Sequence, residues 1–156
     1  MNFFKLVSVI VFGIVQSKAE EFLDLKFRLS TRRASEFCED QNLTDCRLPY
    51  IVTLLTNKSS SYDMEAVSVL DGQLKLESGE RKAFQENAAI ALPDSLSNPS
   101  NQLLVGIKIF GLPSSLLDFY MMDGSKILKE KNQYVKMHIS SHRLRFTSSL
   151  RRGKIG

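Results

Sequence analysis

Apolar and polar residues alternate in several short stretches of this chain, and the first stretch begins at residue 22. In FLDLKFRLS, four apolar side chains share one side and charged side chains separate them: Leu23, Leu25, Phe27 and Leu29. Because successive side chains of a strand point to opposite faces of a sheet, this pattern predicts a β-strand with one face in water. The stretches NQLLVGIKIFG, YVKMHIS and RLRFT alternate in the same way and predict further strands.

The stretch LPYIVTLLT, residues 48–56, is largely apolar on both sides. Tyr50, Val52 and Leu54 face one side, and Ile51, Thr53 and Leu55 face the other. A strand with two apolar faces is typical of the centre of a sheet, so we expect this one to have a neighbour on each edge.

Turn residues divide the rest of the chain. Asp71-Gly72 is expected to join two short strands, MEAVSVL and QLKLE, and Asp123-Gly124 is expected to form a second tight turn between strands. RKAFQENAA is compatible with one helical turn, although Asn87 argues against a long helix. With about eight or nine short strands and almost no helical periodicity, the sequence predicts an all-β protein, an antiparallel β-sandwich in one domain.

The first 19 residues have the features of a secretory signal peptide. A basic start ends at Lys5, an apolar run follows from Leu6 to Val15, and small residues precede a cleavage site after Ala19. A transmembrane anchor is the alternative, but the run is only about half of the roughly 20 residues that span a bilayer. We therefore expect a signal peptide at 1–19, a module at 20–150 and a basic tail at 151–156.

The formal net charge of the whole chain is +4. Removal of residues 1–19 leaves 19 basic and 17 acidic residues, a balance that does not suggest a partner nucleic acid. From Lys126 onward there are nine basic residues and one acid. This basic end could favour acidic surfaces or anionic lipid, and a solvated, partly frayed terminus is an equally good interpretation.

The chain has two cysteines, Cys38 and Cys46. In the secretory pathway they are expected to pair, closing a loop of about eight residues and contributing roughly 2–3 kcal/mol. A metal site is not favoured, because no histidine or further cysteine lies nearby to complete a tetrahedral set. Two sequons, at Asn42 and Asn57, predict N-glycosylation and agree with export.

Motifs of catalysis are missing from the sequence, which has neither a glycine-rich phosphate loop nor a nucleophile elbow. His138 and His142 lie four residues apart on or beside a predicted strand, with no carboxylate nearby to orient them. Exposed strand histidines are the better interpretation, and a metal or catalytic pair is the weaker one. We expect no enzyme, no cofactor and no metal.

The cysteine region resembles the amino-terminal module of the Notch ligands of the Delta/Serrate/LAG-2 type. That module has a strand of the FELRL kind, a cysteine-bearing loop and a strand of the form C-R-x-x-F-x-V-C-L-K; here FLDLKFRL, a polar loop and CRLPYIVTLL follow in the same order. The residues that match the second strand in register are Cys46, Arg47, Tyr50, Val52 and Leu54, with Tyr in place of Phe. Cys38 matches the loop cysteine that pairs with the strand-initial cysteine.

Beyond this region the similarity is looser, and one departure is informative. Thr53 occupies the position of the second strand cysteine of the family, and the later cysteine that pairs with it is missing too. SVLDGQLKL, NQLLVGIKIFG and the last strands resemble corresponding family segments, but the tryptophans that follow F-x-N-P-I-x-F-P-F do not occur here. The 156 residues include no cysteine-rich receptor-binding module and no EGF-like repeat, so the resemblance implies the amino-terminal module alone.

The resemblance implies a C2-like sandwich of about eight strands, secreted or extracellular, that docks on EGF-like repeats of a Notch-type receptor. It also implies that loops at one tip contact lipid. Two alternatives remain: an unrelated secreted β-sandwich that binds lipid or carbohydrate or serves in adhesion, and a secreted effector or inhibitor without a membrane role.

Candidates for the lipid-contacting tip lie in two loops. Arg32 and Arg33 follow the first strand, and GLPSSLLD carries Leu112, Leu116 and Leu117. If the C2-like resemblance holds, both loops lie at one end, where leucines and arginines together would suit an anionic membrane surface. The alternative is that Leu116 and Leu117 begin a strand and belong to the core, which leaves Leu112 as the leucine that we expect to be exposed.

Overall fold

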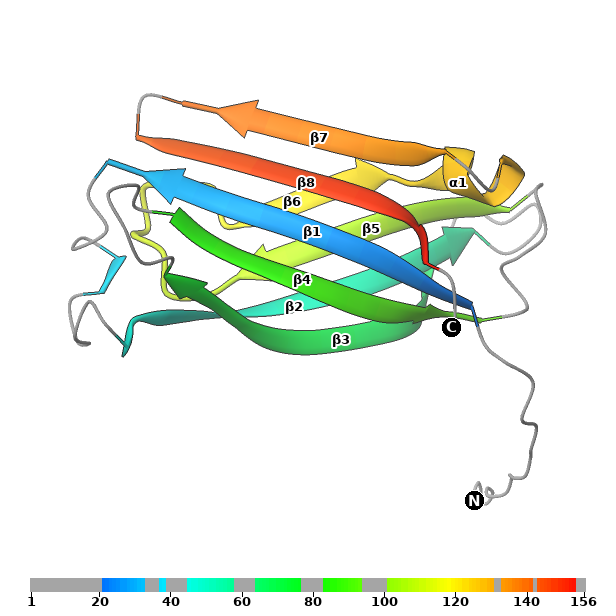
Figure 1. Ribbon diagram of the computed structural model, residues 1–156, viewed down its shortest axis with the longest axis horizontal. Coiled ribbons are helices and arrows are strands. Elements are labelled where there is room, and N and C mark those ends of the chain that lie inside the picture. The colour runs from blue at the N-terminus through cyan, green and yellow to red at the C-terminus, as the bar shows by residue number, and fades with distance from the viewer. Residues whose placement is uncertain are drawn as a thin grey trace, which may run out of the picture.

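The computed structural model of the chain describes residues 21–32, 37–38, 45–57, 64–76, 83–93, 101–130, 133–141 and 143–153. These residues form eight strands and one short helix (Figure 1): β1 (Glu21–Thr31), β2 (Arg47–Asn57), β3 (Met64–Leu76), β4 (Ala83–Leu92), β5 (Gln102–Ile109), β6 (Phe119–Asp123), α1 (Ser125–Lys129), β7 (Tyr134–Ser140) and β8 (Leu144–Gly153). All strand pairs are antiparallel, and the strand order is β6-β5-β2-β3-β4-β1-β8-β7. The prediction of an all-β antiparallel fold with about eight strands is confirmed.

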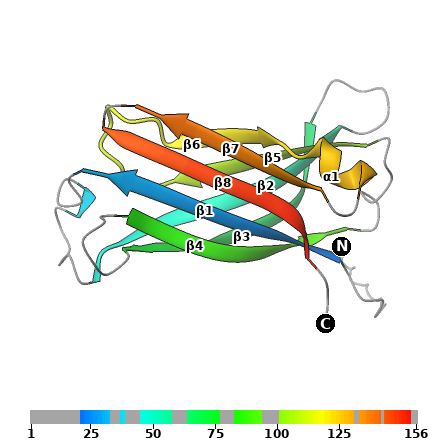
Figure 2. The ribbon, with the colours of Figure 1, turned by 45° about the horizontal axis from the view of Figure 1, so that its top comes forward.

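The single sheet folds back on itself at the junction of β3 and β4. Only two residue pairs join these strands, Lys75 with Gln85 and Leu76 with Phe84, whereas β1 and β4 pair over ten residues. Two four-stranded halves result, β6-β5-β2-β3 and β4-β1-β8-β7, and they face each other across the core (Figures 1 and 2). The fold is therefore sandwich-like and nearly closed.

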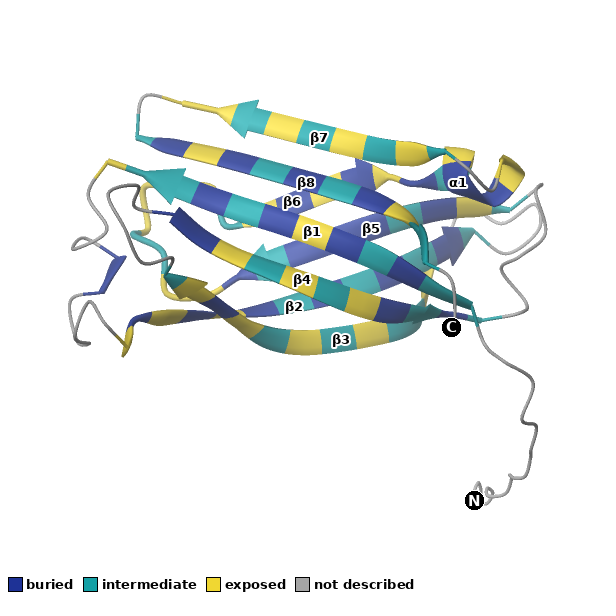
Figure 3. Ribbon diagram, in the orientation of Figure 1, coloured by how far each residue is buried: buried dark blue, intermediate teal, exposed yellow. Residues whose placement is uncertain are grey.

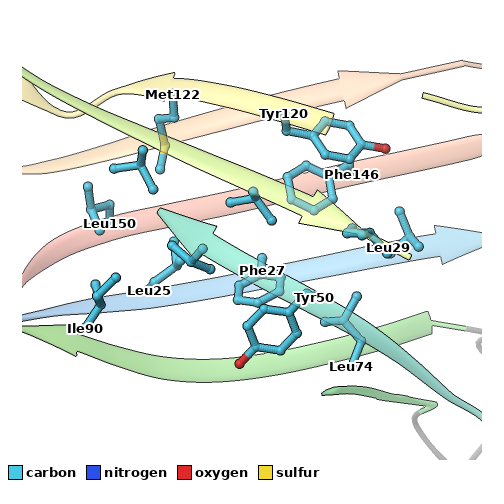
Figure 4. Close-up of a cluster of buried hydrophobic side chains, with 14 of the residues drawn as sticks. Leu25, Phe27, Leu29, Tyr50, Leu74, Ile90, Tyr120, Met122, Phe146 and Leu150 are labelled. Carbon is cyan, nitrogen blue, oxygen red and sulfur yellow. The ribbon is translucent and has the colours of Figure 1, made fainter. Parts of the chain in front are cut away.

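The core lies between the two halves and is built from the alternating positions of the strands (Figure 3). Aromatic rings join the halves in its centre. Tyr120 on β6 stacks on Phe146 on β8 with ring centroids 3.9 Å apart, and Phe27 on β1 meets Tyr50 on β2 edge-on at 4.8 Å (Figure 4). The inward faces predicted for β1, β5 and β8 are confirmed, and each fully buried large side chain stabilises the fold by roughly 1.5–3 kcal/mol.

Strand β2 is central, as its two apolar faces predict, because it pairs with β3 on one edge and β5 on the other. Its inward side chains Tyr50, Val52 and Leu54 are buried. Its other face is half-buried and contributes to the outer surface of the β6-β5-β2-β3 half.

The turn expected at Asp71-Gly72 is wrong. MEAVSVL and QLKL form one strand, β3, in which Asp71 pairs with Ile51 and Gly72 pairs with Tyr50. An Asp-Gly pair indicates a hairpin only where the two flanking strands pair with each other, and here both flanks pair with the same long strand. Gly72 serves a different purpose, since the ring of Tyr50 occupies the space that a side chain at residue 72 would need.

Two other local expectations differ from the structure. From Ala83 onward, the segment considered for a helical turn belongs to β4, where pairing with β1 overrides the weak helical preference. After Asp123 the chain forms α1 rather than a strand: Asp123 Oδ1 accepts a hydrogen bond of 3.0 Å from the Ser125 N–H, and Ile127 and Leu128 are buried.

Strand β8 continues into the residues that the sequence analysis assigned to a basic tail. Arg151 pairs with Asp24 of β1 and Arg152 pairs with Leu23. The Arg152 side chain is mostly buried, and its Nε lies 3.2 Å from Glu21 Oε2. Residues 151–153 are therefore part of the sandwich.

Candidate binding surfaces

Three connections meet at one end of the sandwich, on the left in Figure 1, and we call this region the loop end. It comprises Arg32 after β1, residues 110–118 between β5 and β6, and Ser141 and Arg143 between β7 and β8. One contact closes the β7–β8 turn, and a second joins that turn to the β5–β6 connection. The Ser141 N–H donates to the Leu144 carbonyl at 2.8 Å, and Arg143 Nη1 donates to Ser115 Oγ at 2.8 Å. The two loops that the resemblance placed at one tip do share an end.

Arginines gather around a shallow depression of about 230 Å³ at the loop end. Arg32, Arg143 and Arg145 line it together with the hydroxyl groups of Ser30, Thr31, Ser140 and Ser141. Arginine presents a planar fork of donors that suits phosphate and carboxylate oxygens, so the depression can receive an anionic group. Arg33 lies outside the described residues.

The leucines of the loop end differ in exposure from what the sequence suggested. Leu112 and Leu116 are half-buried and pack against the core, whereas the side chain of Leu117 is 54% exposed. The expectation that Leu112 is the exposed leucine is therefore wrong. Gly111 adopts φ 84°, a left-handed conformation that turns the chain back, and Leu112 follows it onto the core.

The loop that carries Leu117 is held in a defined shape. The Ile109 N–H donates to the Asp118 carbonyl at 2.8 Å, and the Leu116 N–H donates to the Pro113 carbonyl at 2.9 Å. Lys108 Nζ lies 2.8 Å from Asp118 Oδ2, and this hydrogen bond lowers the pKa of the Asp118 carboxyl. Leu117 thus projects from a braced loop.

Cys38 and Cys46 form a disulfide, as predicted, with their Cα atoms 5.7 Å apart. Both cysteines are buried, and the neighbouring Phe37 stacks on Phe84 of β4 with ring centroids 6.0 Å apart. The bridge therefore anchors the loop before β2 to the core. A disulfide is typical of an oxidising environment such as the extracellular space.

The two sequons are placed differently. Asn42 lies outside the described residues. Asn57 is the last residue of β2, half-buried, and its Nδ2 lies 3.3 Å from Gln102 Oε1. Glycosylation of both asparagines stays a prediction.

The residues that carry the family resemblance occupy consistent positions around β2. Cys46 directly precedes the strand, Arg47 is exposed, and Tyr50, Val52 and Leu54 point into the core. Thr53, at the position of the missing family cysteine, faces outward between Val69 on β3 and Gly106 on β5.

The structure does not test His138 and His142 as a metal or catalytic pair, because His142 lies outside the described residues. His138 is exposed on β7. Within the described parts of the chain, no three His, Cys, Asp or Glu side chains come together so that they could hold a metal ion. Among the same residues, no helix is long and apolar enough to cross a bilayer.

The outer faces of the two half-sheets have different chemistry. Val69, Phe119 and Met121 are 62%, 44% and 40% exposed on the β6-β5-β2-β3 half, and we call this surface the apolar face. Met121, Gly106, Thr53 and Val69 form one row across its four strands. The opposite half presents lysine, arginine, amide and hydroxyl side chains.

Sequence reasoning missed Arg143 and Arg145 at the loop end. The sequence shows that these arginines alternate with Leu144 and Phe146. It does not show that the β7–β8 turn lies beside the end of β1. No protein-family model matches this sequence, and no curated protein matches it either. The Notch-ligand resemblance therefore rests on the quoted motifs.

Proposed function

We propose that this chain is a secreted, non-catalytic binding module of the Notch-ligand amino-terminal type. In this proposal it binds EGF-like repeats of a Notch-type receptor and contacts an anionic membrane surface with its loop end. The observation that carries the proposal is the meeting of Arg32, Arg143 and Arg145 with the exposed Leu117 at that end. The disulfide before β2 and the eight-stranded sandwich agree with the C2-like architecture that the resemblance implies.

The expected strength of the membrane contact follows from these residues. A leucine that enters the interface contributes roughly 1.5–3 kcal/mol, and each arginine near an anionic surface contributes about 1 kcal/mol. The total of about 5 kcal/mol corresponds to a dissociation constant somewhat below millimolar. Such contact is weak and reversible, so it would act together with receptor binding rather than anchor the protein alone.

Vesicle sedimentation tests the membrane contact. Wild-type protein is expected to sediment with vesicles that contain phosphatidylserine and to stay in solution with phosphatidylcholine alone. Leu117→Asp and Arg32→Glu should each weaken the binding and leave the melting temperature nearly unchanged, because both side chains are exposed. If wild-type protein does not sediment with anionic vesicles, the membrane contact is refuted.

Matched controls separate the loop end from general effects of charge and apolarity. Val69→Asp removes an exposed apolar side chain from the apolar face, and Lys129→Glu reverses an exposed charge on α1, at the other end of the sandwich. Both controls should bind anionic vesicles like the wild type. If they weaken binding as much as the loop-end variants do, the loop end is not the contact.

The apolar face supports the receptor part of the proposal. Exposed apolar patches bounded by polar residues mark protein contacts, and Asp71, Lys108 and Asp123 flank the row from Val69 to Met121. A pull-down with purified receptor EGF-like repeats is expected to capture wild-type protein. The Val69→Asp/Met121→Asp double variant should bind less, and Lys129→Glu should bind normally.

A second candidate function is an unrelated secreted β-sandwich that binds lipid or carbohydrate. The cationic loop end supports this candidate as well, because binding of lipid or carbohydrate at that end would need no receptor. Vesicle binding without capture by receptor repeats would select this candidate and reject the Notch-ligand assignment.

Export is tested on protein collected from the medium of secreting cells. Its amino terminus is expected at Glu20, and glycosidase treatment should lower its mass in two steps, one each for Asn42 and Asn57. An intact Met1 terminus with no change of mass would contradict secretion.

A further inference from the structure

A groove of about 490 Å³ crosses the outer face of the β4-β1-β8-β7 half, on the side opposite the apolar face. Two adjacent rows of side chains line it, and each row takes one residue from each of the four strands. The first row is Asn87, Lys26, Ser149 and Lys136, and the second is Gln85, Arg28, Thr147 and His138. We call this site the cationic groove.

The chemistry of the cationic groove is ordered by strand. Lysine and arginine come from β1, lysine and histidine come from β7, and the two hydroxyl groups of β8 lie between them. The amides of β4 form the outer margin. Among the described residues that line it there is no carboxylate.

The groove has one neutral end and one cationic end. Beyond Lys26, Asp24 and Arg151 oppose each other, with Arg151 Nε 3.7 Å from Asp24 Oδ2. Beyond Arg28, the next row contains Ser30, Arg145 and Ser140 and leads into the arginine-lined depression of the loop end. Cationic and hydroxyl side chains thus continue along β8 as a path rather than a single pocket.

The spacing suits a chain of anionic groups. Neighbouring strands lie about 4.8 Å apart, so the backbones of Lys26 and Lys136 are separated by about 10 Å across Ser149. Two residues along a strand add about 7 Å between successive rows. The Lys136 ammonium lies 5.1 Å from the Tyr134 ring centroid, and this contact favours one position for it.

We propose that the cationic groove binds a sulfated polysaccharide. Sulfate groups would meet the cations of β1 and β7, and sugar hydroxyl groups would bond the hydroxyls of β8 and the amides of β4. A nucleic acid is disfavoured because His138 is the one ring in the two rows, whereas single-strand binding stacks successive bases on several aromatic side chains. A membrane is disfavoured because the outward residues of the two rows provide no apolar side chain that could enter it.

The proposal goes beyond the proposed function and uses residues that the vesicle test leaves untouched. The test measures the affinity of the full secreted chain for heparin, used as the sulfated probe, at several salt concentrations. Wild-type protein should bind. Its affinity should fall steeply as the salt concentration rises, because the cationic side chains of the protein release counterions from heparin when they bind it. Fully desulfated heparin should not bind.

The decisive variant is Lys26→Glu/Lys136→Glu, and its matched control is Lys126→Glu/Lys129→Glu, which changes the net charge equally at exposed sites on α1, outside the groove. The groove variant should lose at least about tenfold in affinity, and the control less than about twofold. Melting temperatures of both should match the wild type.

Three results would overturn the proposal. One is equal loss of affinity in the groove and control variants, which indicates attraction by net charge alone. Another is equal binding of heparin and its desulfated form. The third is normal heparin binding by the groove variant together with lost binding to phosphatidylserine vesicles, which would reassign the groove to lipid.

Discussion

The ring of Tyr50 on β2 lies directly over Gly72, its partner on β3. A Cβ atom at residue 72 would come within 2.6 Å of Tyr50 Cζ, a distance that real side chains do not show. The same ring meets Phe27 edge-on, and thereby links β3, β2 and β1 near the place where the sheet folds over. Gly72 is thus a packing residue of the core, although its dipeptide has the sequence of a turn.

Gly72→Ala is expected to lower the free energy of unfolding by about 1–3 kcal/mol, because the new methyl group forces the Tyr50 ring out of its position. Chemical denaturation measures the change. Gly106→Ala is the matched control, since a Cβ there would lie 3.4 Å from the Phe119 ring, an ordinary van der Waals contact beneath that ring on the outer side of the sheet. Equal costs for the two variants would contradict the account of Tyr50 packing.

The two buried tyrosines predict a loss of stability in alkaline solution. Burial, and secondarily Glu86 and Asp71, raises the pKa of Tyr50 from 10.0 to about 12, and burial with Asp118 raises the pKa of Tyr120 to about 12. Below pH 10 both phenols are neutral in the folded and unfolded states, and their contribution is fully present. Between pH 10 and about 12 the unfolded chain ionises first, so stability falls as pH rises.

Urea denaturation at about pH 9 and about pH 11 measures this loss. Tyr50→Phe and Tyr120→Phe should each reduce the fall in the unfolding midpoint between the two pH values. If the unfolding midpoint of the Tyr50→Phe/Tyr120→Phe double variant falls as much as that of the wild type, the buried phenols are not the cause of the fall.

The Cys38–Cys46 disulfide predicts a modest but measurable gain in stability. Cys38→Ala/Cys46→Ala should lose roughly 2–3 kcal/mol, the entropy value for a short closed loop. Reduction of the wild type should have a similar effect, whereas the same reductant should leave the variant unchanged. Non-reducing peptide mapping checks the bridge itself, and two free thiols in the secreted protein would contradict it.

The dibasic pair Arg151-Arg152 is expected to resist processing in the native protein. Both residues pair with β1, and the Arg152 side chain is held beside Glu21. A protease specific for dibasic sites should cut the unfolded, reduced chain after Arg152 and leave the native chain intact at this bond. Equal cleavage rates in the two states would mean that pairing with β1 does not protect the end of β8 from the protease.

Strand patterns predicted most of the fold because single-sided burial imposes a period of two. Leu23, Leu25, Phe27 and Leu29 are all buried as that period requires, and the two apolar faces of β2 correctly indicated a central strand. The errors arose where distant partners decide local structure. Gly72 was interpreted from its own dipeptide, but pairing with β2 makes it part of a strand, and the Tyr50 ring leaves no room for a side chain there.

The candidate sites were predicted less completely for the same reason. The sequence identified Arg32 and the leucine loop, but whether Leu112 or Leu117 is exposed depends on how Gly111 turns the chain over Leu48. The cationic groove needs Lys26 and Lys136 to be two strands apart, and only the pairing of β8 with both β1 and β7 brings them together.

The central claim, that the loop end contacts an anionic membrane, is tested most directly by a nuclear magnetic resonance titration of the labelled protein with phosphatidylserine nanodiscs. The account predicts that amide signals of Arg32, Leu117 and Arg143 change first. Signals of Asn57 and Gln102, which pair at the opposite end of the sandwich, should stay in place. Unchanged signals at the loop end, or changes confined to the opposite end, would contradict it.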